Sequence, residues 1–309
     1  MGWSLSRAGA TPPARLNVDR LLSENPLPSG SVRTRKYRAD AVISLLGVPI
    51  YSRQAAGSSF ITLSEATEGD SSVISLQFAG ASTPERVHGV NQAGYIEEVI
   101  VERGSTPVEA AYFGFITSSR EESFEEARQR LVAGHSGGSI RYTAAEGLYR
   151  PGEVKTSVAS VVVPDRDSLD RAGLIRQIRS RFCRDGLLKQ ELRTTTEGRG
   201  SAPSTFLYAV RRAVLARAPR FECTYIHHGR QFNLRTDKNP VAHPENVVRM
   251  VGQVREQGTR SGASFKIWFE DGPEPGLPLR IEYQPRPYLR INLEHDPASD
   301  PGNERQEEI

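Results

Sequence analysis

Apolar and polar residues alternate with a period of two along the C-terminal third of the chain. Between Ala263 and Glu294 this pattern occurs three times, and Pro- and Gly-rich breaks at residues 271–276 and 285–287 separate the runs. Successive side chains of a β-strand point to opposite faces of a sheet, so each run predicts a strand with one apolar and one polar face. The apolar positions are Phe265, Ile267, Phe269, Leu279, Ile281, Tyr283, Leu289, Ile291 and Leu293. The pattern therefore predicts a three-strand antiparallel meander.

The same alternation predicts shorter strands elsewhere, separated by turn residues at intervals typical of an antiparallel meander. Gly47–Tyr51 contains Pro49 and is predicted as a turn or an edge segment, because proline cannot donate a ladder hydrogen bond. Residues 221–227 and 231–236 are predicted to pair as a hairpin around His228–Arg230. The other predicted strands are residues 37–45, 59–64, 72–79, 95–102, 108–117, 139–143, 154–163, 187–196 and 247–254.

Three segments have the pattern of helices. Arg120–Val132 follows serines that can cap a helix and has acidic residues in its first turn, and Gly134 is predicted to end it. A second helix is predicted to start within Asp165–Ser168 and to end at Asp185–Gly186. Phe206–Leu215 is short and apolar, and a helix is favoured there over a strand.

These elements together predict a mainly β fold, an antiparallel twisted sheet in the form of a barrel or half-barrel, with two or three packing helices. The predicted division of the chain leaves open whether there is one domain or two. It comprises a disordered segment at 1–30, a first β-rich half at 31–163, a helical connection at 164–200, a second β-rich half at 201–294 and an acidic disordered tail at 295–309.

Composition narrows the functional classes only slightly. The 309 residues carry a net charge of +3, which is too small to indicate a polyanionic partner, and a GC-rich genome explains the 35 Arg against 5 Lys. Cys183 and Cys223 form no metal-binding pair, and the spacing leaves both a disulfide and two buried thiols open. No segment approaches the roughly 18 apolar residues of a membrane-spanning helix.

The compartment also stays open. Residues 1–30 lack the apolar core of a signal peptide. Basic residues before the apolar run Ala41–Ile50 resemble an internal signal behind a misassigned start, but alternation there favours a first strand. The prediction is the periplasm or cell envelope if the true start lies upstream and includes a signal peptide, and otherwise the cytoplasm.

The sharpest local motif is Gly134-His-Ser-Gly-Gly138, which fits the G-x-S-x-G nucleophile elbow with Ser136 as nucleophile. An elbow needs a strand before the serine and a helix after it. Here the predicted order is reversed, and strands do not alternate with helices along the chain. The preferred interpretation is a Gly-rich helix end, and a serine hydrolase is kept as an alternative.

Other polar groups give weaker signals. His227 and His228 lie at the predicted hairpin turn and point apart, so they form no metal site. The Glu97–Glu98 and Glu121–Glu122 pairs are not predicted to be catalytic. The helix 169–184 is Arg-rich, and a nucleic-acid interface is a second alternative. A solvated face with acidic residues at the start of the helix explains it better, so no nucleic acid is expected. The residues concerned are Arg171, Arg176, Arg179, Arg181 and Arg184.

The second half of the chain resembles a known family in four segments. They are Thr205–Val210, Tyr225–Asp237, Phe265–Phe269 and Leu277–Ile281, a helix, a glycine-turn hairpin and two strand starts. This pattern is similar to the uncharacterised exported bacterial family called domain of unknown function 3108. The resemblance implies a curved antiparallel sheet or half-barrel that acts in the cell envelope, with no established activity.

The leading hypothesis is a non-catalytic protein that binds a lipid, another apolar molecule or a protein partner. A curved two-faced sheet has a concave apolar face that either closes on helices or holds a ligand. Trp268, Tyr283 and Tyr288 are the candidate ligand-binding residues. Trp268 lies on the otherwise polar face of its strand, where packing under a helix is the competing interpretation. No cofactor or metal is predicted, and the sequence leaves the ligand and the oligomeric state open.

Overall fold

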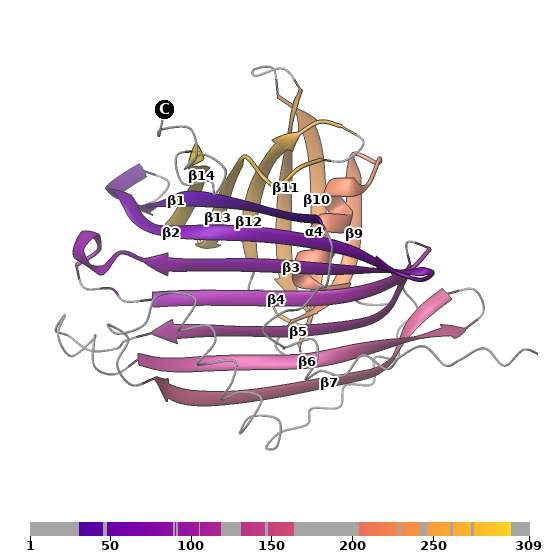
Figure 1. Cartoon of the computed structure of the whole chain (residues 1–309). Coiled ribbons are helices and arrows are strands. Elements are labelled where there is room, and N and C mark those ends of the chain that lie inside the picture. Colours follow the sequence, from indigo (N-terminus) through magenta and orange to yellow (C-terminus); the bar gives the residue numbers. More distant parts are fainter. Residues whose placement is uncertain are drawn as a thin grey trace, which may run out of the picture.

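The computed structural model describes residues 31–45, 48–88, 90, 92–104, 106–118, 131–145, 148–163, 204–227, 230–241, 246–259, 262–272 and 275–297. Within these residues, fourteen strands form one sheet in the order β7-β6-β5-β4-β3-β2-β1-β14-β13-β12-β11-β10-β9-β8 (Figure 1). The strands are β1 (Ser31–Leu45), β2 (Val48–Glu68), β3 (Ser71–Ser82), β4 (Gln92–Arg103), β5 (Thr106–Ser118), β6 (Leu131–Ala145), β7 (Leu148–Val163), β8 (Ser204–Thr205), β9 (Arg220–His227), β10 (Arg230–Pro240), β11 (Val247–Glu256), β12 (Gly262–Glu270), β13 (Arg280–Arg286) and β14 (Leu289–His295).

The sheet curves into a nearly closed, barrel-like shape, which confirms the predicted mainly β antiparallel fold. Apart from the short parallel pair β8–β9, neighbouring strands are antiparallel. The N-terminal strands β1–β7 and the C-terminal strands β8–β14 meet where β1 pairs with β14, from Tyr37↔His295 to Ile43↔Leu289. The predicted meander is present as β12, β13 and β14.

Helix α4 (Phe206–Leu215) packs between these two groups of strands, and it confirms the helix predicted there. Ala209 and Ala213 are fully buried against β9–β12. On another face, Tyr208 joins a buried cluster with Leu63 and Ile100 of the N-terminal strands. Small alanines let the helix approach the sheet closely, so α4 packs on the concave face between β3–β4 and β9–β12.

The core beneath α4 is close-packed against the backbone of β11. A Cβ atom built on Gly252 would lie 2.1 Å from Cζ of Phe265, so the Phe265 ring occupies the space of the missing side chain. Phe265 and Ile267 belong to the same buried cluster as Ala209 and Ala213. The alternation of apolar residues in β12 thus supplies the floor on which the helix packs.

One prediction about local structure was wrong and another was confirmed in one of its two forms. Residues 131 and 132, the predicted end of a helix, lie in β6, and Gly134 is inside that strand and does not end a helix. Gly47–Tyr51, predicted as a turn or an edge segment, contributes to β2 from Val48 onward. β2 pairs with β3 only from Gly57, so Pro49 lies where β2 has β1 as its single neighbour, which confirms the edge alternative.

Several predicted elements fall outside the described residues. These are residues 120–130 of the first helix, the helix over 165–184, the strand over 187–196 and the terminal segments 1–30 and 298–309. Among the residues that the structure describes, α4 is the one α-helix. The helical connection, the disordered segments and the number of domains therefore stay predictions.

An irregularity in β2 separates its first residues from the body of the barrel. The register between β1 and β2 shifts between Ala39 and Ala41, and opposite this shift Ala55 has a φ of 50°. The Ala55 N–H donates to Oδ1 of Asp40 at 2.7 Å. A β-bulge of this kind bends its strand. The β1–β2 hairpin beyond the bulge is therefore tilted relative to the rest of the sheet.

Candidate functional site

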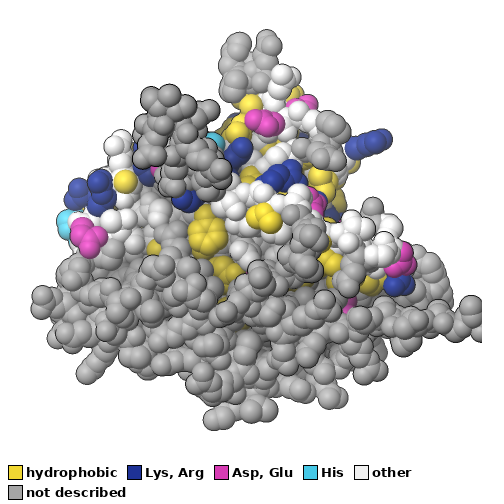
Figure 2. All heavy atoms as spheres, viewed as in Figure 1, with side chains coloured by type: hydrophobic (Ala, Val, Ile, Leu, Met, Phe, Trp, Pro, Cys, Tyr) yellow, Lys and Arg dark blue, Asp and Glu magenta, His cyan; other side chains and the backbone are white. Residues whose placement is uncertain are grey.

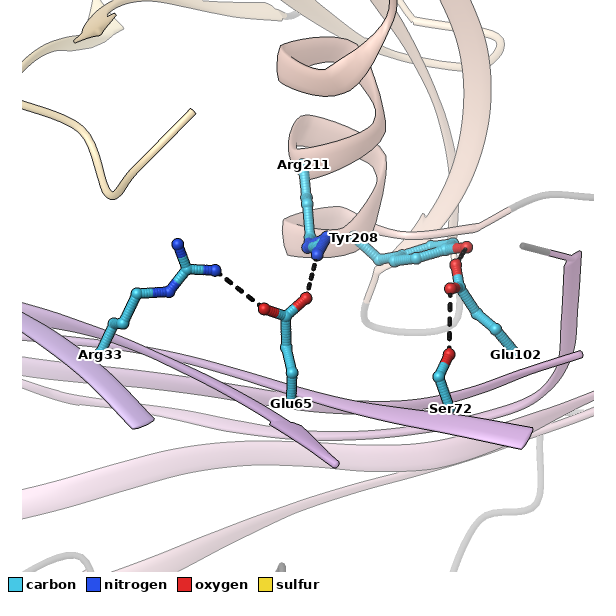
Figure 3. Close-up of polar contacts among 6 residues, drawn as sticks. All are labelled: Arg33, Glu65, Ser72, Glu102, Tyr208 and Arg211. Carbon is cyan, nitrogen blue, oxygen red and sulfur yellow. Dashed lines mark hydrogen bonds and ion pairs between the residues drawn. The ribbon is translucent and has the colours of Figure 1, made fainter. Parts of the chain in front are cut away.

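A cavity of about 570 Å³ lies where α4 crosses the ends of the N-terminal strands. Its polar lining includes Ser31 and Thr67, and beside them Glu65, Ser72, Glu102 and Arg211. Figure 3 shows that the latter four side chains come from β2, β3, β4 and α4 and point into the same region, together with Arg33 and Tyr208. We call this the polar end of the barrel.

Glu65 is the centre of one half of this cluster. Its Oε2 accepts a hydrogen bond from Nη2 of Arg33 at 2.8 Å, and its Oε1 accepts one from Nη2 of Arg211 (Figure 3). The side chains of Arg211 and Glu65 are only 20% and 32% exposed. Partial burial weakens the screening of such pairs by water, so one carboxylate here holds β1, β2 and α4 together.

Glu102 forms the other half. Its Oε1 accepts a hydrogen bond from the Tyr208 hydroxyl, and its Oε2 accepts one from Oγ of Ser72 at 3.4 Å. Both partners are neutral hydroxyl groups. In the part of the chain that the structure describes, no arginine, lysine or histidine lies within ion-pair distance of Glu102.

A third carboxylate, Glu98, caps the start of α4 from β4. Its Oε1 and Oε2 accept hydrogen bonds from the backbone N–H groups of Leu207 and Tyr208, both at 2.9 Å. Glu98 is only 1% exposed. Burial raises the pKa of Glu98 to about 6, and the hydrogen bonds from the start of the helix offset part of that rise. The helix thus begins on a carboxylate from the opposite half of the sheet.

The other end of α4 rests on the C-terminal strands. Lys238 of β10 donates from Nζ to the carbonyl oxygen of Val214 at 2.7 Å and also to that of Ala216. Burial lowers the pKa of Lys238, and the nearby Asp271 opposes that shift. A cation at the helix C-terminus and an anion at its N-terminus both complement the helix dipole. The helix is therefore fixed electrostatically at both ends, by opposite sides of the barrel.

The sequence contains a signal for these carboxylates that the strand analysis missed. Glu65 shares the inner face of β2 with Ile61 and Leu63. Glu98 and Glu102 share the inner face of β4 with Ile96 and Ile100. A glutamate in phase with the apolar residues of a strand is expensive to bury without partners. Such positions therefore indicate a buried polar contact, although they do not say with what.

Large apolar side chains are exposed at the opposite end, where the β1–β2, β3–β4 and β13–β14 connections meet. The exposed fractions are 62% for Leu45, 63% for Val48, 63% for Ile50 and 57% for Tyr288. The Ser44 N–H donates to the carbonyl oxygen of Tyr288 at 2.8 Å, which joins two of the connections. Nη2 of Arg53 in β2 lies 3.0 Å from Nε2 of His88, and this contact joins the β3–β4 connection to the other two. We call this region the apolar end.

The structure separates the three predicted ligand-binding residues. Tyr288 belongs to the apolar end, and Tyr283 faces the barrel interior beside Phe265 and Ile291, with 40% of its surface exposed. Burial raises the pKa of Tyr283. Trp268 lies on the outer face of β12, where the Arg280 guanidinium carbon is 4.9 Å from its ring centroid. Its environment is thus a cation–π contact, away from both tyrosines.

Ser136 lies in the middle of β6, where it pairs with Gly114 of β5 and Val158 of β7. A nucleophile elbow places its serine at a strand–turn–helix junction. The backbone at Ser136 is extended on both sides. The strand–turn–helix junction that a serine hydrolase of this type needs is therefore not present at Ser136. The interpretation of this motif as a helix end was wrong for the same reason.

Glu97 and Glu98 point to opposite faces of β4, as expected of neighbours on a strand. Glu97 accepts hydrogen bonds from Nε2 of Gln77 at 3.1 Å and from the Tyr95 hydroxyl at 3.0 Å, whereas Glu98 caps α4. The two carboxylates therefore share no substrate position.

The remaining candidates are only partly described. Cys183, His228, Glu121–Glu122 and the arginines of the helix 169–184 lie outside the described residues. Cys223 lies on β9, where burial raises the pKa of its thiol to about 11. Among the residues that the structure places, no cluster of three or more His, Cys, Asp or Glu could hold a metal ion. Within the same residues, no helix has the length and apolar character needed to span a bilayer.

Comparison with known proteins yields a distant structural similarity. No protein-family model matches the sequence, and no curated protein matches it. Among solved structures, the chain is similar to a β-barrel-like protein of domain of unknown function 1849 from Brucella abortus. The TM-score is 0.45 and the identity 8%, over 85% of this chain and 95% of that chain. The resemblance to domain of unknown function 3108 stays a prediction.

Proposed function

We propose that this barrel-like protein is a non-catalytic lipid-binding protein of the bacterial cell envelope, and that it contacts lipid through its apolar end. The observation that carries the proposal is the exposure of Leu45, Val48, Ile50 and Tyr288 on adjoining connections. Contiguous exposed apolar side chains mark interaction surfaces in soluble proteins, because each one costs hydration free energy that a partner can recover. The resemblance to an exported family supports the compartment.

The interior of the barrel is a poorer candidate for the lipid site. Helix α4 covers the concave face beside β9–β12, and its alanines are fully buried there. Beside Glu98, the cavity lined by Ile96, Tyr112 and Ile226 measures only about 10 Å³. An acyl chain does not fit in that space, and most of the large apolar side chains that are exposed among the described residues lie at or next to the connections of the apolar end.

The charges around the apolar end favour a lipid surface as the partner. Arg53, Arg86 and Arg286 lie on or next to its connections, and Glu85 is a neighbouring acidic residue. In the described part of the chain, none of these three arginines forms an ion pair with a carboxylate. Figure 2 shows basic side chains, in dark blue, gathered at the left edge of the molecule. Arginines around an exposed apolar tip complement anionic headgroups around acyl chains.

Flotation with lipid vesicles tests the proposal. The wild-type protein should float with phosphatidylcholine vesicles that contain phosphatidylglycerol. Leu45→Ser/Val48→Ser should bind about a hundredfold more weakly or not at all, because burial of each Leu or Val side chain is worth about 1.5–3 kcal/mol. The matched control is Val32→Ser/Leu215→Ser, which removes side chains that are 65% and 45% exposed away from the apolar end.

Equal loss of binding in the control pair, or no flotation of the wild type, would overturn the proposal. Native mass spectrometry adds a second readout, because a copurified lipid should be present in the wild type and depleted in Leu45→Ser/Val48→Ser. Labelling of Ser136 by a fluorophosphonate probe, lost in Ser136→Ala, would instead identify a serine hydrolase and contradict the non-catalytic assignment.

A further inference from the structure

The polar end has a composition that packing alone does not require. Its cavity of about 570 Å³ is within the size range of small-molecule sites, roughly 300–1,000 Å³. Carboxylate, guanidinium and hydroxyl groups from β1, β2, β3, β4 and α4 line it. This region is separate from the apolar end, so a ligand bound here is independent of the proposed lipid binding.

The charges of the polar end are paired unevenly, because both arginines contact the same carboxylate. Arg33 and Arg211 both pair with Glu65, which leaves no described cation for Glu102. In Figure 3, Glu102 stands apart from the Arg33–Glu65–Arg211 group and meets only the hydroxyls of Tyr208 and Ser72. A carboxylate has about four lone-pair positions, so two hydroxyl donors leave it able to accept more.

We propose that this cavity binds a small molecule with a primary ammonium group, which donates hydrogen bonds to Glu102. An ammonium group would place a positive charge and further hydrogen-bond donors directly at Glu102, and charge-assisted hydrogen bonds of this kind are the strong ones. The Tyr208 and Ser72 hydroxyls hold the carboxylate in place from α4 and β3. The adjacent Glu65–Arg211 pair offers polar contacts to the rest of the molecule.

A divalent metal ion suits this site less well than an ammonium group. Hard cations such as Ca²⁺ take about six to eight oxygen ligands, with several carboxylates among them. At the polar end, both oxygens of Glu65 accept hydrogen bonds from arginines, and no group of three metal-ligating side chains occurs among the described residues. One free carboxylate in a roomy cavity fits a monovalent organic cation.

Calorimetric titration with ethanolamine tests the assignment, with choline as a comparator because its quaternary nitrogen has no N–H donor. Ethanolamine should bind saturably to the wild type and to Asp70→Asn, in which an exposed carboxylate on the neighbouring β2–β3 turn is removed. Glu102→Gln should weaken binding about tenfold or more, because hydrogen bonds to charged groups contribute roughly 1.5–3 kcal/mol.

A second variant guards against misfolding of Glu102→Gln. Thr67 is exposed at the rim of the cavity, so Thr67→Trp should obstruct the site, abolish ethanolamine binding and leave the charges unchanged. No saturable binding to the wild type would overturn the inference. Unchanged affinity in both Glu102→Gln and Thr67→Trp, or equal affinity for choline, would overturn it as well.

Discussion

The polar end and the apolar end are built from the same strands, yet they distribute charge and apolar surface in opposite ways. At the polar end, Glu65 is two-thirds buried between Arg33 and Arg211, and Glu98 is almost fully buried under α4. At the apolar end, Leu45 and Val48 are more than half exposed. Folding alone favours the reverse, with apolar groups inside and charges in water.

The difference separates what stabilises this fold from what is available for contacts. Helix α4 connects the two groups of strands through hydrogen bonds at both of its ends, so substitutions there should lower the free energy of unfolding. The connections of the apolar end contribute little to the core, so substitutions there should change binding and leave stability nearly unchanged. Single substitutions should therefore distinguish the two roles.

The largest effect is expected from Glu98→Ala. This change leaves the backbone N–H groups of Leu207 and Tyr208 without their acceptor, at roughly 1–3 kcal/mol for each group. We expect the free energy of unfolding in urea to fall by about 3 kcal/mol. The matched variant Glu98→Gln keeps one acceptor oxygen and replaces the other by an NH2 donor, so only one of the two N–H groups loses its partner and the loss should be about half as large, roughly 1–2 kcal/mol. Equal losses in the two variants would contradict the capping role.

Glu98 should also make stability depend on pH. Its pKa is raised from 4.5 to about 6 in the folded protein, so the folded state binds this proton at a higher pH than the unfolded state does. The free energy of unfolding should therefore rise as the pH falls from about 6 to about 4.5, by about 2 kcal/mol from this group. Urea titrations across that window measure the slope, and the Glu98→Gln variant should lack the Glu98 contribution.

The smallest effect is expected at the bulge that carries the apolar hairpin. Ala55 adopts a left-handed backbone conformation, which costs an L-residue with a Cβ atom about 1–2 kcal/mol. Ala55→Gly relieves that cost but adds freedom to the unfolded chain, so we expect a net gain of about 0.5 kcal/mol. Thermal unfolding measures this gain, and vesicle flotation should stay unchanged. A loss of stability would show that the bulge does not strain the chain.

Much of the fold could be predicted because it follows local patterns. The alternation in residues 263–294 specified three strands and their pairing, and the short apolar segment 206–215 was correctly favoured as a helix. The misjudged helix end at Gly134 shows the limit of such patterns. Glycines that suit a helix terminus also fit a long strand when neighbouring strands pair on both sides, as β5 and β7 do here.

The polar end could not be predicted in the same way, because its contacts join residues far apart in the chain. Glu98 and Leu207 are separated by 109 positions, and Arg211 and Glu65 by 146. The phase of Glu98 and Glu102 within β4 marks them as inward-facing, but only the curvature of the sheet brings α4 to them. For Trp268, the sequence showed that the side chain lies on the polar face of its strand. It did not show that Arg280 is the residue it contacts.

The first and last strands of the barrel lie side by side in the middle of the sheet. β1 and β14 pair there, and the two edges of the sheet, β7 and β8, follow one another among the strands that the structure describes. The Asp296 N–H donates to the carbonyl oxygen of Lys36 at 3.0 Å, so the end of the last strand lies against the first. A circularly permuted chain that ran from β8 through β14 and β1 to β7 would pair every strand with its neighbour in sequence. The barrel is thus a simple meander whose starting point has been moved to its middle, and the β1–β14 seam is the pairing that brings the largest loop-closure entropy to folding.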